Sequence, residues 1–560
     1  MKNKEIGQVE FLVIILSLLC LIIYEFGFCN WNAIVTRSYN FSLFRIVVYT
    51  VAIILYKKFS KSLMEEAEKI IHSKKKVIIL YLLMMAILTI YECDTNENIY
   101  SIFLILLTEL NGLIFILCVT KSYIKNIILS IITFGFLFSI TTTVYHVVDE
   151  KKHFLSALNV ADGNFNFKNN AITDEVFDKM EFYNPSTNLA IEYFGVKYHE
   201  NKYKIPEDEE IYSTPAANFP ILYIPSAIGI NCARLLGGSV ADIFIAGRVS
   251  NIICYGILLI IIFKILKFKQ DIFYCSYFLP MAIVLGASYS IDALTIGIIG
   301  IFIAYVLKLK RENKEVITFK QFLILLGLSI LCLMCKNGAY LGVCMLMFLL
   351  PIFKSIKRDK KILWTIIIIL VLILGLGMYE LLKMATSSQG DPRVDGTNPV
   401  KQIEFLLENP TNILTVYSNY LRLSIFNLNW YTGFNLKIFC GKYYSVLTFI
   451  LFIFILYKSI IDNTYTFTKK DKIIMFATFG MTFLITTFVF YLSVTPVGTL
   501  TINGYQARYV IAILPLILVN VNSKKVAKDY REMCTYNKTA LYMGMLTVFD
   551  LVSKIFSMYG

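Results

Sequence analysis

Charged residues are scarce in this chain. Only 16% of its 560 residues are charged, whereas 57% are hydrophobic, a balance that soluble domains of this length do not have. The composition therefore excludes an ordinary soluble enzyme. The chain also lacks a GxGxxG sequence after a strand and lacks a P-loop, so no signature of a soluble nucleotide-binding domain is present.

A single basic face is also missing. The formal net charge is +14, but the Lys and Arg residues form short clusters between apolar runs, the pattern by which membrane proteins mark their cytoplasmic side. We therefore expect no nucleic-acid partner. The basic N-terminus leads into an apolar run with no small-residue cleavage site after it, which predicts a retained first helix and not a removed signal.

Apolar runs long enough to cross a bilayer core, about 20 helical residues, recur along the chain. They predict an all-α polytopic membrane protein with about 13–15 transmembrane helices, four of them in residues 1–125 and the rest in 126–560. Large external loops, at about 149–238 and 386–442, are expected to carry short interfacial helices. The predicted spans are about 9–28, 40–57, 76–92, 100–120, 126–148, 240–266, 271–289, 290–309, 318–335, 338–354, 361–384, 442–458, 472–494, 507–521 and 538–556.

The loops between these spans predict the orientation. Lys57–Lys76 and Lys121–Lys125 are basic and are expected inside, whereas Glu92–Glu97 has no basic residue and is expected outside. The later basic loops, such as Lys264–Lys269, fall on the inner side in the same count. The N-terminus is then cytoplasmic and Asp149 reaches the outer surface of the cell membrane.

The segment Asn126–Asn170 is the candidate reaction centre. Its apolar part stops at Asp149-Glu150, and His153 follows four residues after Asp149, so the two share one face of a continuing helix that Gly163 ends. Asp149 is a candidate general base or ligand of a divalent metal (Mg or Mn), with Glu150 supporting it. Alternatively, the acids only mark the water interface and His153 is only a polar cap.

Further polar residues stand at the predicted ends of spans. Lys336 and Arg508 are candidate contacts for a lipid phosphate, the latter held by Gln506 and Tyr509, although snorkelling and boundary anchoring are the plainer roles. Asp292 suits the first turn of a span, where the helix dipole favours an acid. Arg248 lies inside a span and requires a partner, for which Asp242 or Asp292 is expected.

Several of these segments resemble known families. Asp149-Glu150-Lys-Lys-His153-Phe154 followed by Ala161-Asp-Gly163 resembles the acidic first-loop motif of the GT-C glycosyltransferase superfamily. Phe219-Pro220-Ile-Leu-Tyr223, with Gly247-Arg248 behind it, is similar to the segment that follows that loop. A closer resemblance, over roughly Thr141 to Asn522, is to the bacterial membrane-protein family DUF2142, carried by Leu279-Pro280, Ser290-Ile-Asp292-Ala293-Leu294, Lys336 and Gln506-Ala-Arg508-Tyr509. Phe219-Pro220-Ile stands where paired prolines are usual, and Ala507 where Gly is usual.

The resemblance implies a GT-C fold with its active site on the outer face and a polyprenyl-phosphate sugar as the donor. It does not identify the acceptor, which we expect to be a glycan or lipid of the cell envelope. Asp149 and Glu150 are then catalytic. His153, Lys336, Arg508, Tyr509 and Arg248 contact the donor, and Asp292, Asn337, Gln506 and Tyr223 support them. The alternatives are a transporter or flippase of lipid-linked sugars, against which the lack of an internal repeat argues, and a non-catalytic envelope scaffold or sensor.

Overall fold

The structure is a computed structural model. It describes residues 50, 64–93, 99–142, 145, 147–165, 173–174, 202–203, 218–238, 240–312, 315–351, 394–424, 444–462, 464–521 and 537–559. Within these residues the protein is helical except for one short antiparallel pair, β1 (Thr173–Asp174) with β2 (Lys202–Tyr203).

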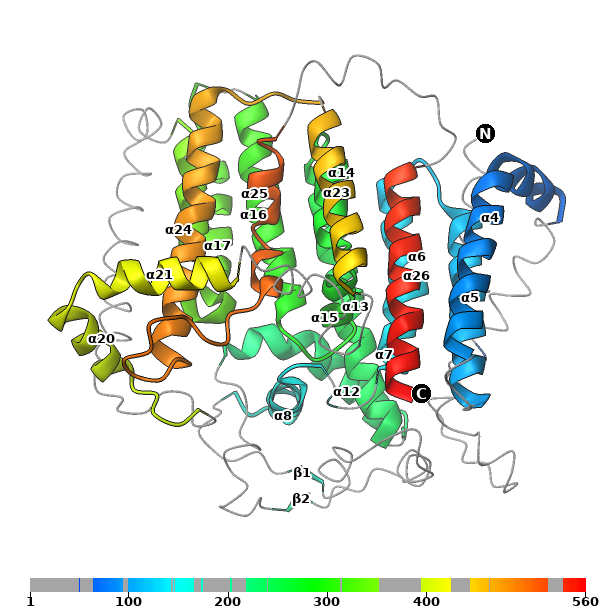
Figure 1. Cartoon of the computed structure of the whole chain (residues 1–560), viewed down its shortest axis with the longest axis horizontal. Helices are drawn as coiled ribbons and strands as arrows, with labels where there is room; N and C mark the ends of the chain where they lie inside the picture. The colour runs from blue at the N-terminus through cyan, green and yellow to red at the C-terminus, as the bar shows by residue number, and fades with distance from the viewer. Residues whose placement is uncertain are drawn as a thin grey trace.

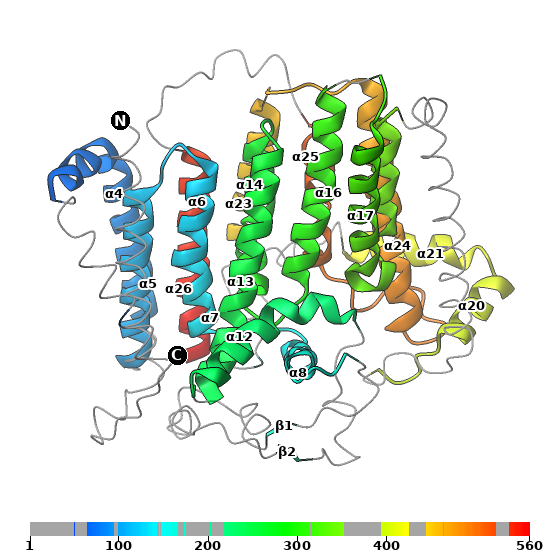
Figure 2. The ribbon, with the colours of Figure 1, turned by 180° about the vertical axis from the view of Figure 1, so that it is seen from behind.

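Most helices stand upright and side by side (Figures 1 and 2). At one end of the bundle, α8 and α12 lie across the helix ends, and α21 lies across α24 part-way along its length. The elements are α4 (Met64–Cys93), α5 (Ile99–Cys118), α6 (Tyr123–Ser130), the π-helix η3 (Ile131–Gly135), α7 (Phe136–Thr141), α8 (Glu150–Ala161), η6 (Pro220–Tyr223), α12 (Ile224–Leu235), α13 (Val240–Ile265), α14 (Gln270–Tyr277), α15 (Pro280–Gly286), α16 (Asp292–Glu312), α17 (Phe319–Met334), η7 (Cys335–Gly338), η8 (Leu341–Leu349), α20 (Pro399–Glu408), α21 (Asn412–Leu423), α23 (Tyr444–Ile461), α24 (Lys469–Ser493), η11 (Ala507–Val510), α25 (Leu514–Leu518) and α26 (Lys538–Tyr559).

The predicted fold class, an all-α polytopic membrane protein, is confirmed. Among the described residues, five helices are long and apolar enough to cross a membrane: Tyr123–Ile140, Asp242–Ile265, Asp292–Glu312, Phe319–Gly338 and Lys469–Ser493. Each lies close to a predicted span. The predicted spans at 9–28 and 361–384 lie outside the described residues, as does 40–57 apart from residue 50.

Four predicted spans differ from the structure. The run 271–289 is divided into α14 and α15 at Pro280, and 507–521 into η11 and α25 near Pro515, since proline cannot donate the backbone hydrogen bond that a continuous helix needs. In the described part of the run 338–354, residues 338–351, the helical elements are the end of η7 and the 3-10 helix η8, with no α-helix. The run 126–148 stops being helical at Thr141, seven residues early.

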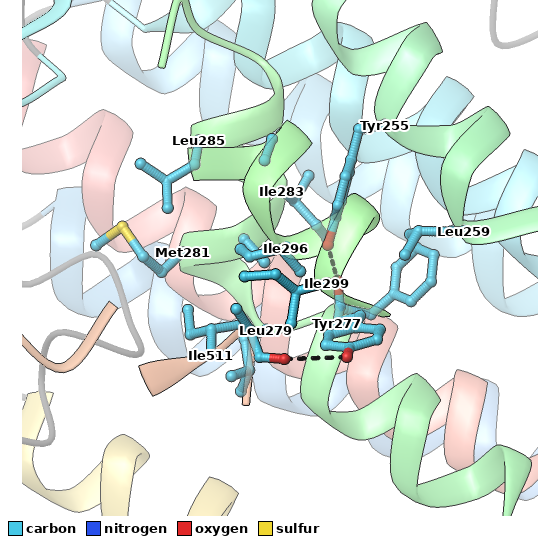
Figure 3. Packing of buried hydrophobic residues seen from close by; sticks show 14 of the residues in the cluster. Tyr255, Leu259, Tyr277, Leu279, Met281, Ile283, Leu285, Ile296, Ile299 and Ile511 are labelled. Atoms are coloured by element: carbon cyan, nitrogen blue, oxygen red, sulfur yellow. Dashed lines mark hydrogen bonds between the residues drawn. The ribbon is translucent and has the colours of Figure 1, made fainter. Parts of the chain in front are cut away.

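The breaks at Pro280 and near Pro515 leave carbonyl groups without helical partners, and buried tyrosines satisfy one at each break. The hydroxyl of Tyr255 donates to the carbonyl of Tyr277 at 2.6 Å, and the hydroxyl of Tyr277 donates to the carbonyl of Ala512 at 3.2 Å (Figure 3). Both tyrosines are fully buried among aliphatic side chains. A buried carbonyl without a donor costs free energy, so these bonds stabilise both breaks and join α13, α14 and the segment before α25.

The two ends of the bundle differ in charge. Lys264 ends α13, Lys310 and Arg311 end α16, and Lys469-Lys470 begin α24, all at the end opposite α8 and α12 (Figures 1 and 2). On η6 and α12 the large exposed side chains are Ile221, Ile224, Ile228 and Leu235, one apolar stripe at helical spacing. Such a stripe suits a helix that lies in the membrane interface, as the sequence predicts for this segment.

Gly229 brings the backbones of α12 and α13 into contact. A Cβ at this position would lie 2.2 Å from the carbonyl oxygen of Ala246, a backbone atom that cannot move aside. We expect Gly229→Ala to destabilise the protein by about 1–3 kcal/mol, measured as a lower midpoint of thermal unfolding in detergent. Gly480→Ala on α24, where nothing lies within 4 Å of the new Cβ, is the control and should unfold no earlier than wild type. Equal midpoints for the two variants would contradict the α12–α13 contact.

Candidate functional site

The site is built around α8, which carries two of the predicted residues. Asp149 precedes the helix with a φ of 62°, in the left-handed region, and α8 ends before Gly163, whose φ is +75°. The predicted helix after Asp149 is therefore confirmed, although it does not continue the preceding span. At its far end, Asn231 of α12 donates to the carbonyl of Ala161 at 2.9 Å, and Arg234 pairs with Asp162 at 2.8 Å. These contacts fix α8 across the ends of the upright helices.

Glu150 and Arg248 form a buried ion pair. Arg248 of α13 donates through Nε to Oε1 of Glu150 at 2.8 Å and through Nη2 to Oε2 at 2.6 Å. Its Nη1 donates to the carbonyls of Thr142 at 2.6 Å and Ser139 at 3.1 Å, next to the end of α7. The guanidinium also lies over the ring of Phe244, 4.6 Å from its centroid. The pair thus joins the end of α7, the start of α8 and the middle of α13.

This geometry differs from two expectations. The sequence predicts Asp242 or Asp292 as the partner of Arg248, and this is wrong, because the ion pair of Arg248 is with Glu150, the first residue of α8. The sequence also predicts a catalytic role for Glu150 and a donor contact for Arg248. The structure buries both side chains and pairs them with each other, which leaves neither facing an incoming substrate.

Four charged side chains from four separate segments meet beside the start of α8. Arg508 in η11 lies between two carboxylates: its Nη2 is 3.7 Å from Oδ2 of Asp149, and its Nε is 3.7 Å from Oδ2 of Asp292. Lys336 in η7 pairs with Asp292 at 2.5 Å. The structure therefore brings together Asp149, Asp292, Lys336 and Arg508, which the sequence predicts to meet. We call these four residues the charged cluster.

The charged cluster is open on one side. The side chains of Asp149 and Lys336 are 28% and 20% exposed, whereas those of Asp292 and Arg508 are 7% and 3% exposed. Both carboxylates lie beyond hydrogen-bond distance from Arg508, and its Nε makes no hydrogen bond to the described part of the chain. A buried guanidinium with an unused donor next to an opening is suited to an anionic oxygen.

Tyr509 holds the two cations in place. Nη2 of Arg508 donates to its hydroxyl at 2.9 Å, and Nζ of Lys336 lies 4.2 Å from its ring centroid. The hydroxyl of Tyr340 donates to the backbone carbonyl of Tyr509 at 2.8 Å. A cation over an aromatic ring is stabilised without its charge being neutralised, so Tyr509 positions both cations and leaves their charge unchanged.

His153 and Tyr223 form an uncharged pair beside the charged cluster. Nδ1 of His153 lies 2.9 Å from the hydroxyl of Tyr223, and Asn218 donates to the same hydroxyl at 3.3 Å. Burial lowers the pKa of His153 to about 4, with Asp292 acting in the opposite direction. Burial also raises the pKa of Tyr223. Both side chains are therefore neutral near pH 7.

The backbone around the charged cluster is unusual. Lys336 and Asn337 both have positive φ, 47° and 52°, as does Asp149. Side chains other than glycine rarely adopt this conformation, and it is found most often where a function requires it. Asn337 is exposed beside Lys336, and Gln506 directly precedes η11 with an Oε1 that makes no hydrogen bond within the described residues.

A comparison with known families now places the chain. The family model of DUF2142, a predicted membrane protein, matches residues 132–517. The chain belongs to this family. No curated protein and no solved structure matches it. The match contains α8 and all four residues of the charged cluster, so the site belongs to the family's part of the chain, whereas α4, α5 and α26 lie outside it.

The described residues of this DUF2142 protein do not form a good site for the divalent metal of which Asp149 is a candidate ligand. Within these residues, no group of three or more His, Cys, Asp or Glu side chains could hold a metal ion. Arg508 lies beside both Asp149 and Asp292, and Lys336 pairs with Asp292. The two carboxylates that would bind a metal thus already lie beside cations of the protein.

Sequence reasoning did not single out Asn218 or Tyr340. Asn218 lies in a polar stretch five residues before Tyr223, and its contact depends on how the chain turns at Pro220. Tyr340 follows the strained turn at Lys336, and its partner Tyr509 is 169 residues away. Neither residue belongs to a local motif, so only the tertiary structure identifies them.

The buried ion pair gives a first prediction for the site. Arg248→Met leaves a buried carboxylate without its partner, which typically costs about 3–5 kcal/mol, and should lower the midpoint of thermal unfolding strongly. Glu150→Leu combined with Arg248→Met should recover part of this loss, because no buried charge remains. Asp162→Asn, which breaks the exposed pair with Arg234, should cost at most about 1 kcal/mol. A free catalytic role for Glu150 would instead leave the stability of Arg248→Met unchanged.

The buried imidazole predicts how stability depends on pH. The pKa of His153 is about 4 in the folded protein and about 6.5 in an unfolded chain. As the pH falls from 6.5 to 4, the unfolded state binds a proton that the folded state does not, so the free energy of unfolding decreases. His153→Gln removes this contribution and should flatten the loss of thermal stability between pH 7.5 and 4.5. Identical slopes for the variant and wild type would mean that the imidazole is not held neutral.

Proposed function

We propose that this protein is an integral membrane glycosyltransferase that moves a sugar from a polyprenyl-phosphate donor to a glycan or lipid hydroxyl of the cell envelope. The observation that carries the proposal is the charged cluster: a buried Arg508 with an unused donor, and a half-exposed carboxylate, Asp149, beside it. Group transfer from a lipid phosphate needs a cation for the phosphate and a base for the acceptor hydroxyl at one place.

The expected reaction has one step. The acceptor hydroxyl gives its proton to the carboxylate of Asp149, and its oxygen forms a bond to the anomeric carbon of the sugar. The bond between that carbon and the phosphate oxygen breaks, and its electron pair stays on the polyprenyl phosphate. The added negative charge develops next to Lys336 and Arg508, which stabilise it. Asp292 holds both cations in position before the donor arrives.

The place of the charged cluster supports transfer at a membrane surface. Asp292 begins α16, Lys336 lies two residues after the end of α17, and Asp149 directly precedes α8. The charged cluster therefore lies at helix ends, opposite the basic ends of α13, α16 and α24. By the positive-inside rule this end is extracytoplasmic. Transporters of lipid-linked substrates usually bind near the middle of the bilayer, which makes transport the weaker alternative.

The carboxylate of Asp149 provides the test. Asp149→Asn should abolish transfer, by on the order of 10²–10⁴-fold if the group is the general base, while the protein still binds undecaprenyl phosphate in lipid nanodiscs. Activity is read from mass spectra of envelope glycans in cells that carry wild type, the variant or no protein.

Asp162→Asn, the same chemical change at the far end of α8, is the matched control and should restore the wild-type glycan profile. A profile that is the same with and without the wild-type protein would contradict the proposed function. A normal profile with Asp149→Asn would contradict only the assignment of Asp149 as the base and would leave the proposed function standing.

A further inference from the structure

The pair of His153 and Tyr223 has a feature that the proposed reaction does not yet use. Nδ1 of His153 is occupied by the hydroxyl of Tyr223, but its Nε2 makes no hydrogen bond to the described part of the chain. The side chain is 8% exposed, and it lies close enough to Asp149, Asp292, Lys336 and Arg508 for all four charges to act on it. One edge of the ring is thus fixed, and the other edge is left for a ligand.

The hydrogen bonds around Tyr223 indicate which ring nitrogen carries the proton. Asn218 Nδ2 has only hydrogens to offer, so it occupies a lone pair of the Tyr223 oxygen. The single hydroxyl proton of Tyr223 has two neighbouring acceptors, the hydroxyl of Ser156 and Nδ1 of His153 at 2.9 Å. We assign it to Nδ1, because an imidazole nitrogen is a much stronger base than an alcohol oxygen. A neutral imidazole that accepts at Nδ1 carries its proton at Nε2. In this arrangement the free edge of His153 is a hydrogen-bond donor.

We propose that His153 is a neutral donor that binds, through Nε2, an oxygen of the transferred sugar rather than the phosphate. This inference rests on the proposed function and names the part of the donor that each residue contacts. Lys336 and Arg508 bind the charged phosphate, and the uncharged chain of Asn218, Tyr223 and His153 binds a hydroxyl or ring oxygen. The backbone N–H of His153 donates to the carbonyl of Asp149 at 3.1 Å, so His153 lies in the first turn of α8 next to Asp149. The proposed contact therefore falls close to the reacting carbon.

The lack of charge on His153 and Tyr223 agrees with binding to the sugar and not to the phosphate. A phosphate oxygen carries charge and binds most strongly to cations, whereas sugar hydroxyls are neutral and are recognised by a few placed neutral donors and acceptors. His153 stays neutral well below pH 7, so its hydrogen bond does not depend on the pH at which the protein works. A site that hydrogen-bonds a substrate hydroxyl discriminates strongly against a sugar that lacks it.

The protonated nitrogen can be measured directly. The chain has four histidines, His72, His146, His153 and His199, so protein labelled with 15N only in histidine gives few side-chain signals, and His153→Gln identifies the signal of His153. We expect the Nε2–H tautomer from pH 8 down to pH 5, with Nδ1 unprotonated. An Nδ1–H tautomer, or a charged ring at pH 6, would overturn the proposal whether or not the protein is a glycosyltransferase.

Two variants test which contact determines the tautomer of His153. Tyr223→Phe removes the hydroxyl proton and should produce a mixture of the two tautomers. Ser156, whose own hydroxyl donates to the carbonyl of Lys152 at 2.9 Å, also lies next to the phenol oxygen. Ser156→Ala should leave the tautomer unchanged, because the phenol proton already goes to His153. An Nδ1–H tautomer in the wild type that becomes Nε2–H in Ser156→Ala would show that the phenol of Tyr223 donates to Ser156 instead of His153.

The ligand assignment is tested by comparing two conservative variants. Gln can place an amide donor near the Nε2 position, whereas Asn reaches only as far as Nδ1, so His153→Gln should keep more sugar transfer than His153→Asn by about tenfold or more. Both variants should bind undecaprenyl phosphate in nanodiscs within about twofold of wild type, whereas Arg508→Gln should bind it at least about tenfold more weakly. A loss of undecaprenyl-phosphate binding in His153→Asn equal to that in Arg508→Gln would make His153 a phosphate contact and overturn the proposal.

Discussion

The site depends on the buried pair of Glu150 and Arg248. A charge in this position is tolerated only because its partner binds it with two hydrogen bonds, and because two backbone carbonyls take up the remaining donors of the guanidinium. The carbonyls belong to the end of α7, where a helix leaves acceptors without partners. Arg248 therefore both ends the preceding span and anchors the start of α8, which fixes the backbone of Asp149, the residue directly before Glu150.

The two adjacent acids, Asp149 and Glu150, have different surroundings and therefore different roles. Both belong to one acidic motif, yet their surroundings are opposite: Glu150 is 0% exposed and bound by two hydrogen bonds from a guanidinium, whereas Asp149 is 28% exposed and 3.7 Å from one. The buried carboxylate of Glu150 is part of the scaffold, whereas the partly exposed carboxylate of Asp149 can exchange its partner for a substrate. The left-handed backbone at Asp149 turns consecutive side chains in these different directions.

The sequence predicted the parts of this structure that follow from local chemistry. Long apolar runs predicted α13, α16, α17 and α24 within a few residues, and the acidic stop after Val148 predicted the start of α8. Isolated charges at the ends of spans identified Asp292, Lys336 and Arg508, because a charge at the edge of a membrane needs a reason. Prolines divide two of the predicted spans. The length and composition of an apolar run did not reveal these breaks, because they are the same whether or not the helix is continuous.

The partners of the charges were harder to predict. Asp242 and Asp292 were the expected partners of Arg248, and its pairing with Glu150 depends on where the chain places the start of α8 relative to α13, which no local motif indicates. Asn218 and Tyr340 were not singled out for the same reason. Residue types at span ends thus show which groups a site contains, whereas the pairing among them is a property of the tertiary structure.

The pairing also explains how a cluster with two acids and two cations can attract an anion. Lys336 is bound closely to Asp292, but Arg508 lies 3.7 Å from each of two carboxylates and keeps an unused donor at Nε. At this distance the carboxylates reduce the cost of burying the guanidinium without forming the short hydrogen bonds that a phosphate would have to displace. A phosphate oxygen can therefore gain a charge-assisted bond to Arg508 while the charged cluster keeps its existing pairs. The same arrangement leaves the carboxylate of Asp149 beside a cation and 28% exposed, so we expect the chemistry on the partly exposed side of the charged cluster and not on its buried side.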